Sequence, residues 1–180
     1  MDDAHACYRG LAGHGTGRIA ITGDSAGGNL ALVLARITTG QASSHLTAPA
    51  AAVVLSPVTD LAMTGLSWES RAVADPYFVR AQAASLISSY LRDADPMDPT
   101  ASPLYGDLVG LPPIRVQVGD DEVLLDDSLR YAERLRAAKL EVAAHVWVGM
   151  PHVFPAALGR LAAAGTCLDD IGAFLRACLQ

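Results

Sequence analysis

Short apolar runs alternate with longer stretches of helical periodicity along this chain. The apolar runs suit buried strands, and they cover residues 19–22, 51–55, 114–118 and 141–148. The stretches rich in helix formers cover residues 2–11, 29–36, 80–91, 126–139, 155–164 and 166–179. Strands that alternate with helices predict βαβ units and an α/β fold with a mostly parallel sheet. In such a sheet, functional sites lie beyond the carboxyl ends of the strands.

One long segment, residues 58–113, interrupts this alternation. It is rich in proline and aromatic residues and holds a single clear helical pattern at residues 80–91. Apolar residues recur there at spacings of three and four, which predicts one buried face; they are Ala84, Leu86, Ile87, Tyr90 and Leu91. A connection this long is uncommon unless it covers a site. A cap-like insertion and a plain packed connector both fit.

Composition and charge narrow the class of protein. The 180 residues suffice for one domain with a sizeable core. A net charge of −6 argues against nucleic acid or an acidic membrane as a partner, and no apolar run approaches a membrane span. The first residues lack the layout of a signal peptide. Three widely spaced cysteines without a C-x-x-C pair predict reduced thiols in a cytoplasmic protein rather than disulfides or a zinc site.

The first predicted strand leads into a short motif with chemical meaning. Residues 23–27 read Gly-Asp-Ser-Ala-Gly, a G-x-S-x-G pattern, and a helix-forming stretch follows at once. Strand, glycine-flanked serine and helix together predict a nucleophile elbow centred on Ser25. Such a turn strains the serine backbone, and the small neighbours let strand and helix pass close together. The helix N-terminus also places free N–H groups beside the hydroxyl.

Two later strand ends carry the partners that a serine nucleophile needs. Asp120, Asp121 and Glu122 follow the third predicted strand, and His152 follows the fourth. Histidine is the suitable base, and an acid must orient its ring. The order serine, acid, histidine, with one group at each strand end, therefore predicts a catalytic triad. Position alone does not choose among the three acids.

The other histidines fit this pattern less well. His5 precedes the organised part of the chain, and His145 lies inside a predicted strand. His14 belongs to the Gly-rich run 13–17, which precedes a strand and is therefore better explained as a connector than as an anion-binding loop. His45 lies in a polar connector, where we expect it at the surface.

The motifs together resemble those of the hormone-sensitive-lipase-like family of α/β-hydrolase esterases. They read GDSAGGNLAL, DPMDPTASPLYGDLVGLPP, VGDDEVLLDD and WVGMPHVF. The resemblance implies a serine esterase that acts on small acyl esters without metal or organic cofactor, with the Ala26 N–H as an oxyanion donor. The family's acid heads an acid-x-Leu-x-Asp pattern. Glu122 fits this pattern, and Asp121 is the alternate.

The resemblance covers only the C-terminal part of the family's fold. Members carry a His-Gly-Gly-Gly loop upstream of the elbow, with further strands and cap helices, and nothing before residue 18 matches these features. We therefore expect a truncated α/β-hydrolase domain over residues 1–180, with a cap-like insertion at about 58–113 and weak or no activity alone. Its first strand would form an exposed edge.

Two further expectations follow from the resemblance. An inactive remnant or a small-molecule-binding protein of the same fold is the rival to the esterase. Relatives often pair through the last strand, so a homodimer through residues 141–148 is compatible with the sequence.

Overall fold

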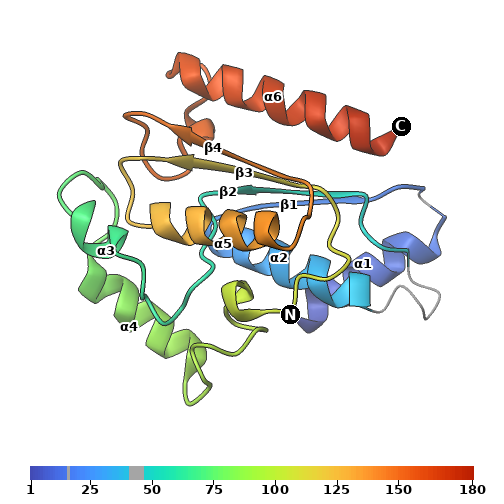
Figure 1. Ribbon diagram of the computed structural model, residues 1–180, viewed down its shortest axis with the longest axis horizontal. Coiled ribbons are helices and arrows are strands. Elements are labelled where there is room, and N and C mark those ends of the chain that lie inside the picture. Colours follow the sequence, from blue (N-terminus) through green and yellow to red (C-terminus); the bar gives the residue numbers. More distant parts are fainter. Residues whose placement is uncertain (16, 41–46) are drawn as a thin grey trace.

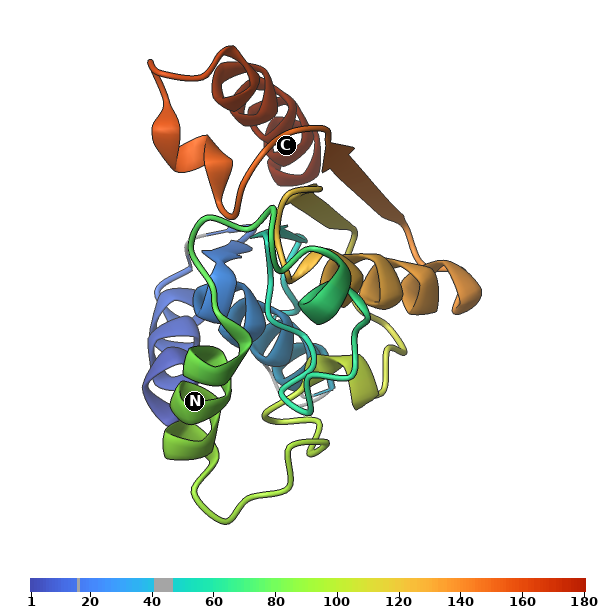
Figure 2. The ribbon, with the colours of Figure 1, turned by 90° about the vertical axis from the view of Figure 1, so that its left-hand side faces the viewer.

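Four parallel strands form the sheet of the computed structural model, which describes residues 1–15, 17–40 and 47–180. They lie in the order β1 (Ala20–Asp24), β2 (Ala51–Leu55), β3 (Ile114–Gly119) and β4 (Val142–Trp147). The expected parallel sheet is therefore confirmed, and each predicted strand is present. Because all strands run the same way, their carboxyl ends lie together at one end of the sheet, which faces the viewer in Figure 2.

Helices cover both faces of the sheet (Figure 1). One face carries α1 (Asp2–Gly13), α2 (Ser25–Gly40) and α5 (Leu125–Ala137), and the other carries α6 (Ala162–Leu179). Alternate residues of β2 point to opposite faces. Ala52 and Val54 pack in the core under α2 and α5, whereas Ala51 and Val53 pack against α6. This three-layer arrangement of helix, sheet and helix agrees with the predicted α/β fold.

The segment between β2 and β3 holds α3 (Ser67–Ser70), α4 (Arg80–Leu91) and η2 (Pro103–Tyr105). Helix α4 has the predicted bounds, but the prediction that one face is buried is wrong. Ala83 is the buried residue of α4, while Leu86 and Tyr90 are 69% and 66% exposed. The helix lies at the outside of the described chain and packs through Ala83 and Ile87, so the rest of its apolar face meets solvent.

The chain after β4 also differs from expectation. Instead of a helix over residues 155–164, a 3₁₀ turn, η3 (Phe154–Ala157), comes first. Gly159 then takes a φ of 81°, a left-handed conformation that ends the turn before α6 begins.

Strands β1 and β4 are the two edges of the sheet in the described chain. The prediction of an edge position for the first strand is confirmed. The homodimer through residues 141–148 stays a prediction. Residues 41–46, with His45, lie outside the described residues, as does Thr16 of the Gly-rich run. Across residues 1–15, 17–40 and 47–180, no helix has the length and apolar character that a membrane crossing requires.

A close backbone approach joins the end of β3 to the loop after β4. A Cβ on Gly119 would lie 1.9 Å from the Met150 carbonyl oxygen. Only glycine therefore fits where β3 passes this loop, and the contact brings the loop against the acidic turn that follows β3.

We predict that Gly119→Ala forces these two backbones apart and lowers the free energy of unfolding by about 3 kcal/mol. Gly10→Ala in α1 is the control, because its Cβ would meet nothing within 4 Å. It should raise stability by about 0.5–1 kcal/mol through helix propensity. Urea denaturation followed by circular dichroism measures both. An unchanged midpoint for Gly119→Ala would contradict the close approach.

Candidate active site

Ser25 lies at the sharp turn between β1 and α2. Its φ is 52°, the left-handed conformation expected of an elbow serine. A Cβ on Gly23 would lie 2.2 Å from the Gly27 carbonyl oxygen, so this position needs glycine. Gly27 itself has room, since its nearest contact would be Asp24 at 3.9 Å. Gly28 rather than Gly27 allows the second close approach, because its Cβ would lie 3.0 Å from that of Pro57.

The first turn of α2 presents free backbone donors beside Ser25. Ala26 is the second residue of the helix, so its N–H has no acceptor within the helix. Its side chain is exposed, and Ser25 is partly exposed. A hydrogen bond from the Val58 N–H to the Ser25 carbonyl oxygen, at 3.2 Å, also fixes this turn. An N–H with this placement can stabilise a developing oxyanion.

Asn29, one turn further along α2, anchors the same helix from within the core. Its side-chain amide donates to the carbonyl oxygens of Val58 and Ala101, at 2.9 and 2.7 Å. These bonds tie the helix that begins at Ser25 to the start of the long connecting segment and to a second point within it. No pattern in the sequence predicts this role, because both acceptors are backbone atoms far along the chain.

Glu122 and His152 form a buried pair. His152 Nδ1 lies 2.7 Å from Glu122 Oε2, and the side chains are 9% and 0% exposed. The other oxygen, Oε1, accepts the Gly119 N–H and the Ser56 hydroxyl, both at 2.7 Å. A carboxylate only accepts, so His152 carries its proton on Nδ1 and leaves Nε2 free to act as a base.

The two other acids of the cluster do different things. Asp120 Oδ1 accepts the Gly149 N–H at 2.6 Å and so supports the turn after β4. The backbone N–H of Asp121 donates to the Met150 carbonyl oxygen at 3.2 Å, and its side chain is half-buried. Of the three acids, the structure therefore places Glu122 against His152.

Ser25 and His152 border the same short segment after β2. Val58 contacts the Ser25 carbonyl oxygen, and the Val153 N–H donates to Ser56 Oγ at 3.0 Å. Within the part of the chain that the structure describes, no hydrogen bond joins Ser25 Oγ to His152. Hydrogen bonds of this kind are often long in a free enzyme and tighten with substrate.

An aromatic ring from the long segment lies against His152. The Phe78 ring meets the imidazole edge-to-face, with centroids 4.9 Å apart. Phe78 is positioned by Asp75, whose Oδ1 accepts the N–H groups of Tyr77 and Phe78 at 2.8 and 3.0 Å. The second oxygen of Asp75 accepts the Val123 N–H at 2.8 Å, directly after Glu122. One buried carboxylate thus joins the aromatic contact to the acid turn.

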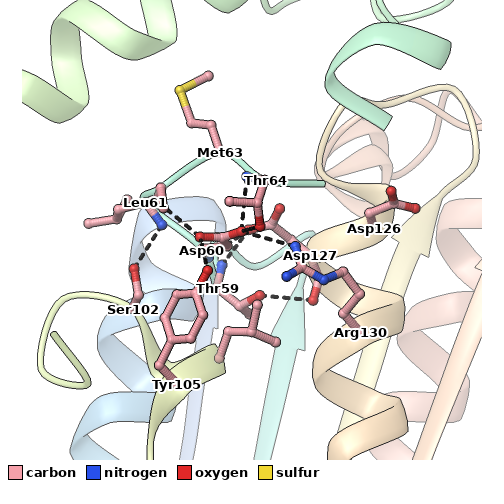
Figure 3. A network of polar contacts seen from close by, with 12 residues as sticks. Thr59, Asp60, Leu61, Met63, Thr64, Ser102, Tyr105, Asp126, Asp127 and Arg130 are labelled. Atoms are coloured by element: carbon pink, nitrogen blue, oxygen red, sulfur yellow. Dashed lines mark hydrogen bonds and ion pairs between the residues drawn. The ribbon is translucent and has the colours of Figure 1, made fainter. Parts of the chain in front are cut away.

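A second network ties the segment after β2 to α5 (Figure 3). Asp127 Oδ2 accepts the N–H groups of Thr59 and Asp60, at 2.7 and 2.9 Å. Asp60 pairs with Arg130 at 2.9 Å and also accepts the hydroxyls of Thr64 and Tyr105. Both carboxylates are fully buried. These contacts hold residues 59–64 against the helix that follows Glu122.

The pKa values of the two carboxylates in this network are shifted in opposite directions. Burial raises the pKa of Asp127 to about 7, and the nearby Asp60 charge adds to this, against the two backbone N–H donors. Burial alone would raise the pKa of Asp60 too, but hydrogen bonds from Thr64, Tyr105 and Arg130 together hold that pKa below its ordinary value. Asp127 Oδ1 has no partner among the described residues, which favours its neutral form.

No group of three or more His, Cys, Asp or Glu side chains within residues 1–15, 17–40 and 47–180 could hold a metal ion.

Comparisons with known proteins point to one family. A family profile for the alpha/beta hydrolase fold matches residues 1–156. An acetyl-hydrolase of Streptomyces hygroscopicus is 39% identical over 178 residues, which are 98% of this chain and 58% of that protein. An esterase of Acinetobacter venetianus is 37% identical over 157 residues, which are 87% of this chain and 51% of that protein.

Solved structures give the same picture. The crystal structure of an esterase from the bacterial hormone-sensitive lipase (HSL) family matches with a TM-score of 0.92 and 39% identity. The match covers 99% of this chain and 60% of that one. The chain thus spans 51–60% of the length of these three relatives.

The Asp127 network predicts a distinctive dependence of stability on pH. Between the unfolded pKa of about 3.9 and the folded pKa of about 7, the folded chain binds more protons at Asp127. Its stabilising contribution is therefore full below the lower value and is lost as pH rises through the upper one. Asp127→Asn cannot titrate. The stability of this variant relative to wild type should rise from pH 4 to pH 7, by at most about 1.4 kcal/mol per pH unit.

Urea denaturation at several pH values measures this difference, and Asp169→Asn on the exposed face of α6 is the control. Parallel pH dependences for wild type and Asp127→Asn would show that Asp127 is not protonated in the folded chain.

Proposed function

The chain belongs to the hormone-sensitive-lipase family of α/β hydrolases, whose members include esterases and lipases, and on that premise we propose that Ser25, His152 and Glu122 form the catalytic triad of a serine carboxylic-ester hydrolase. The hydrogen bond between Glu122 and His152 carries the proposal. It fixes the tautomer that a general base needs, in a chain whose elbow serine has the strained backbone of a nucleophile.

The reaction follows from these positions. Ser25 Oγ attacks the ester carbonyl carbon while His152 Nε2 takes its proton, and Glu122 stabilises the imidazolium. His152 then gives the proton to the leaving alcohol, and an acyl-enzyme on Ser25 remains. Water, activated by the same histidine, hydrolyses this intermediate and restores the serine.

The oxyanion of the tetrahedral intermediate would accept the Ala26 N–H. Removing one donor from an oxyanion hole costs about 10²–10³ in rate. Because these 180 residues supply the Ala26 donor and no His-Gly-Gly-Gly motif, we expect weak turnover from them alone.

The substrate would be a small acyl ester, in keeping with the acetyl-hydrolase among the relatives. We propose that residues 58–113 act as a cap-like insertion over the site. The contact of Phe78 with His152 supports this, because it brings the segment to within 4.9 Å of the base, measured between ring centroids.

A fluorophosphonate probe tests the nucleophile. We expect it to label the 180-residue protein at Ser25, with the same site releasing p-nitrophenol slowly from p-nitrophenyl acetate, and Ser25→Ala should do neither. Mass spectrometry of the labelled peptide identifies the residue. A folded sample that stays unlabelled would favour the alternative function, an inactive or small-molecule-binding protein of the same fold.

Paired variants test the acid. Glu122→Gln should slow the labelling of Ser25 by about 10²–10⁴, since the amide favours the wrong tautomer of His152. Asp121→Asn should leave the rate close to that of wild type, because the described contacts of Asp121 run through its backbone. The time course of probe incorporation gives both rates. If only the Asp121 change abolishes labelling, Asp121 is the acid.

A further inference from the structure

Ser56 stands where the acid and the base of the site meet. It follows β2 directly and is 1% exposed. Its hydroxyl donates to Glu122 Oε1 at 2.7 Å and accepts the Val153 N–H at 3.0 Å. One side-chain oxygen thus joins the carboxylate to the residue that follows His152.

The backbone at Ser56 is shaped for this contact. Its φ is 47°, an uncommon conformation for a residue with a side chain, and Val153 has a φ of 50°, which is more costly for a β-branched residue. The Ser56 N–H donates to the Gln117 carbonyl oxygen at 2.8 Å, which fixes the residue to β3. Strained conformations persist where the surrounding structure holds them. Ser56 and Val153, which the hydrogen bond to Ser56 Oγ joins, both have such a conformation.

We propose that Ser56 is a positioning residue for the Glu122–His152 pair, an inference that rests on the proposed function of that pair. Its donated hydrogen bond fixes Oε1, so that Oε2 faces His152 Nδ1. Its accepted hydrogen bond fixes the backbone of the loop that carries His152. A hydroxyl is suited to this position because it donates and accepts at one atom.

Removal of the hydroxyl should loosen both partners together. Glu122 Oε1 would keep the Gly119 N–H as its donor, and the carboxylate could turn about its remaining bonds. The partly buried Val153 N–H would lose its acceptor. Both changes act on the orientation of the imidazole, not on the space that a substrate occupies.

The chain offers a matched control in Ser102. This serine is fully buried, and its hydroxyl donates to the Pro96 carbonyl oxygen and accepts the Leu61 N–H, at 2.7 and 2.8 Å. It therefore bridges two segments as Ser56 does, without contact to Glu122 or His152. Ser102→Ala reports what the loss of a buried bridging hydroxyl does to the fold alone.

Proton NMR of the 180-residue protein gives a readout that a merely structural role would not move. A histidine Nδ1 proton held between nitrogen and a buried carboxylate gives a resonance at unusually low field, and its loss in His152→Gln assigns it. We expect Ser56→Ala to shift or abolish this resonance and Ser102→Ala to retain it. Absence of the resonance in wild type, or its retention in Ser56→Ala, would overturn the inference.

The rate of Ser25 labelling by the fluorophosphonate gives the second readout. Ser56→Ala should slow it by up to about 10²-fold, the cost of a small misplacement of catalytic groups, and Ser102→Ala should not. Equal rates for the two variants would contradict the inference. Ser56→Gly, which suits a positive φ, replaces Ser56→Ala if that variant fails to fold. If wild type is not labelled at all, the proposed function fails and the NMR resonance alone decides the role of Ser56.

Discussion

The buried carboxylate of Glu122 is the constraint around which the strand ends are arranged. A carboxylate removed from water is costly unless hydrogen-bond donors surround it. Glu122 meets this requirement with donors from three places: Gly119 at the end of β3, Ser56 at the end of β2, and His152 after β4. To satisfy one side chain, the chain must bring three segments together. The same hydrogen bonds orient His152. The contacts that allow Glu122 to be buried therefore also set the geometry of the proposed site.

The same device orders the long segment between β2 and β3. Backbone N–H groups in an irregular segment need partners when they are buried, and here buried carboxylates supply them. Asp75 accepts the N–H of Tyr77 in the long segment and the N–H of Val123 in the turn after β3. Asp127 accepts the N–H groups of Thr59 and Asp60. These contacts fix the segment to the N-terminal part of α5, although the segment has little regular secondary structure of its own. They also place Phe78 against His152.

Three strained backbone positions lie near the carboxyl ends of the strands. Ser25, Ser56 and Val153 all have a positive φ, and each directly follows a strand end or the proposed base. Strain of this kind needs a rigid surrounding, which the sheet, the close approach at Gly119 and the network of buried acids provide. By contrast, no strand of the described chain pairs with the outer side of β1, and Ala26 on α2 is exposed. The part of the site around the acid and base is thus enclosed, while the part around the serine is open.

Local pattern alone determined the four strands, the position of α4 and the elbow at Ser25, because apolar runs, glycine punctuation and helix propensity act over a few residues. The resemblance to the family's acid-x-Leu-x-Asp pattern singled out Glu122. Such a pattern carries information because relatives share one fold. Only the tertiary structure decided how much of the apolar face of α4 is buried, since this depends on what lies beside the helix. Only the tertiary structure showed the roles of Ser56, Asp75 and Asn29, because their partners are distant backbone atoms or a side chain 66 residues away, and a hydrogen bond across such a distance leaves no pattern along the chain.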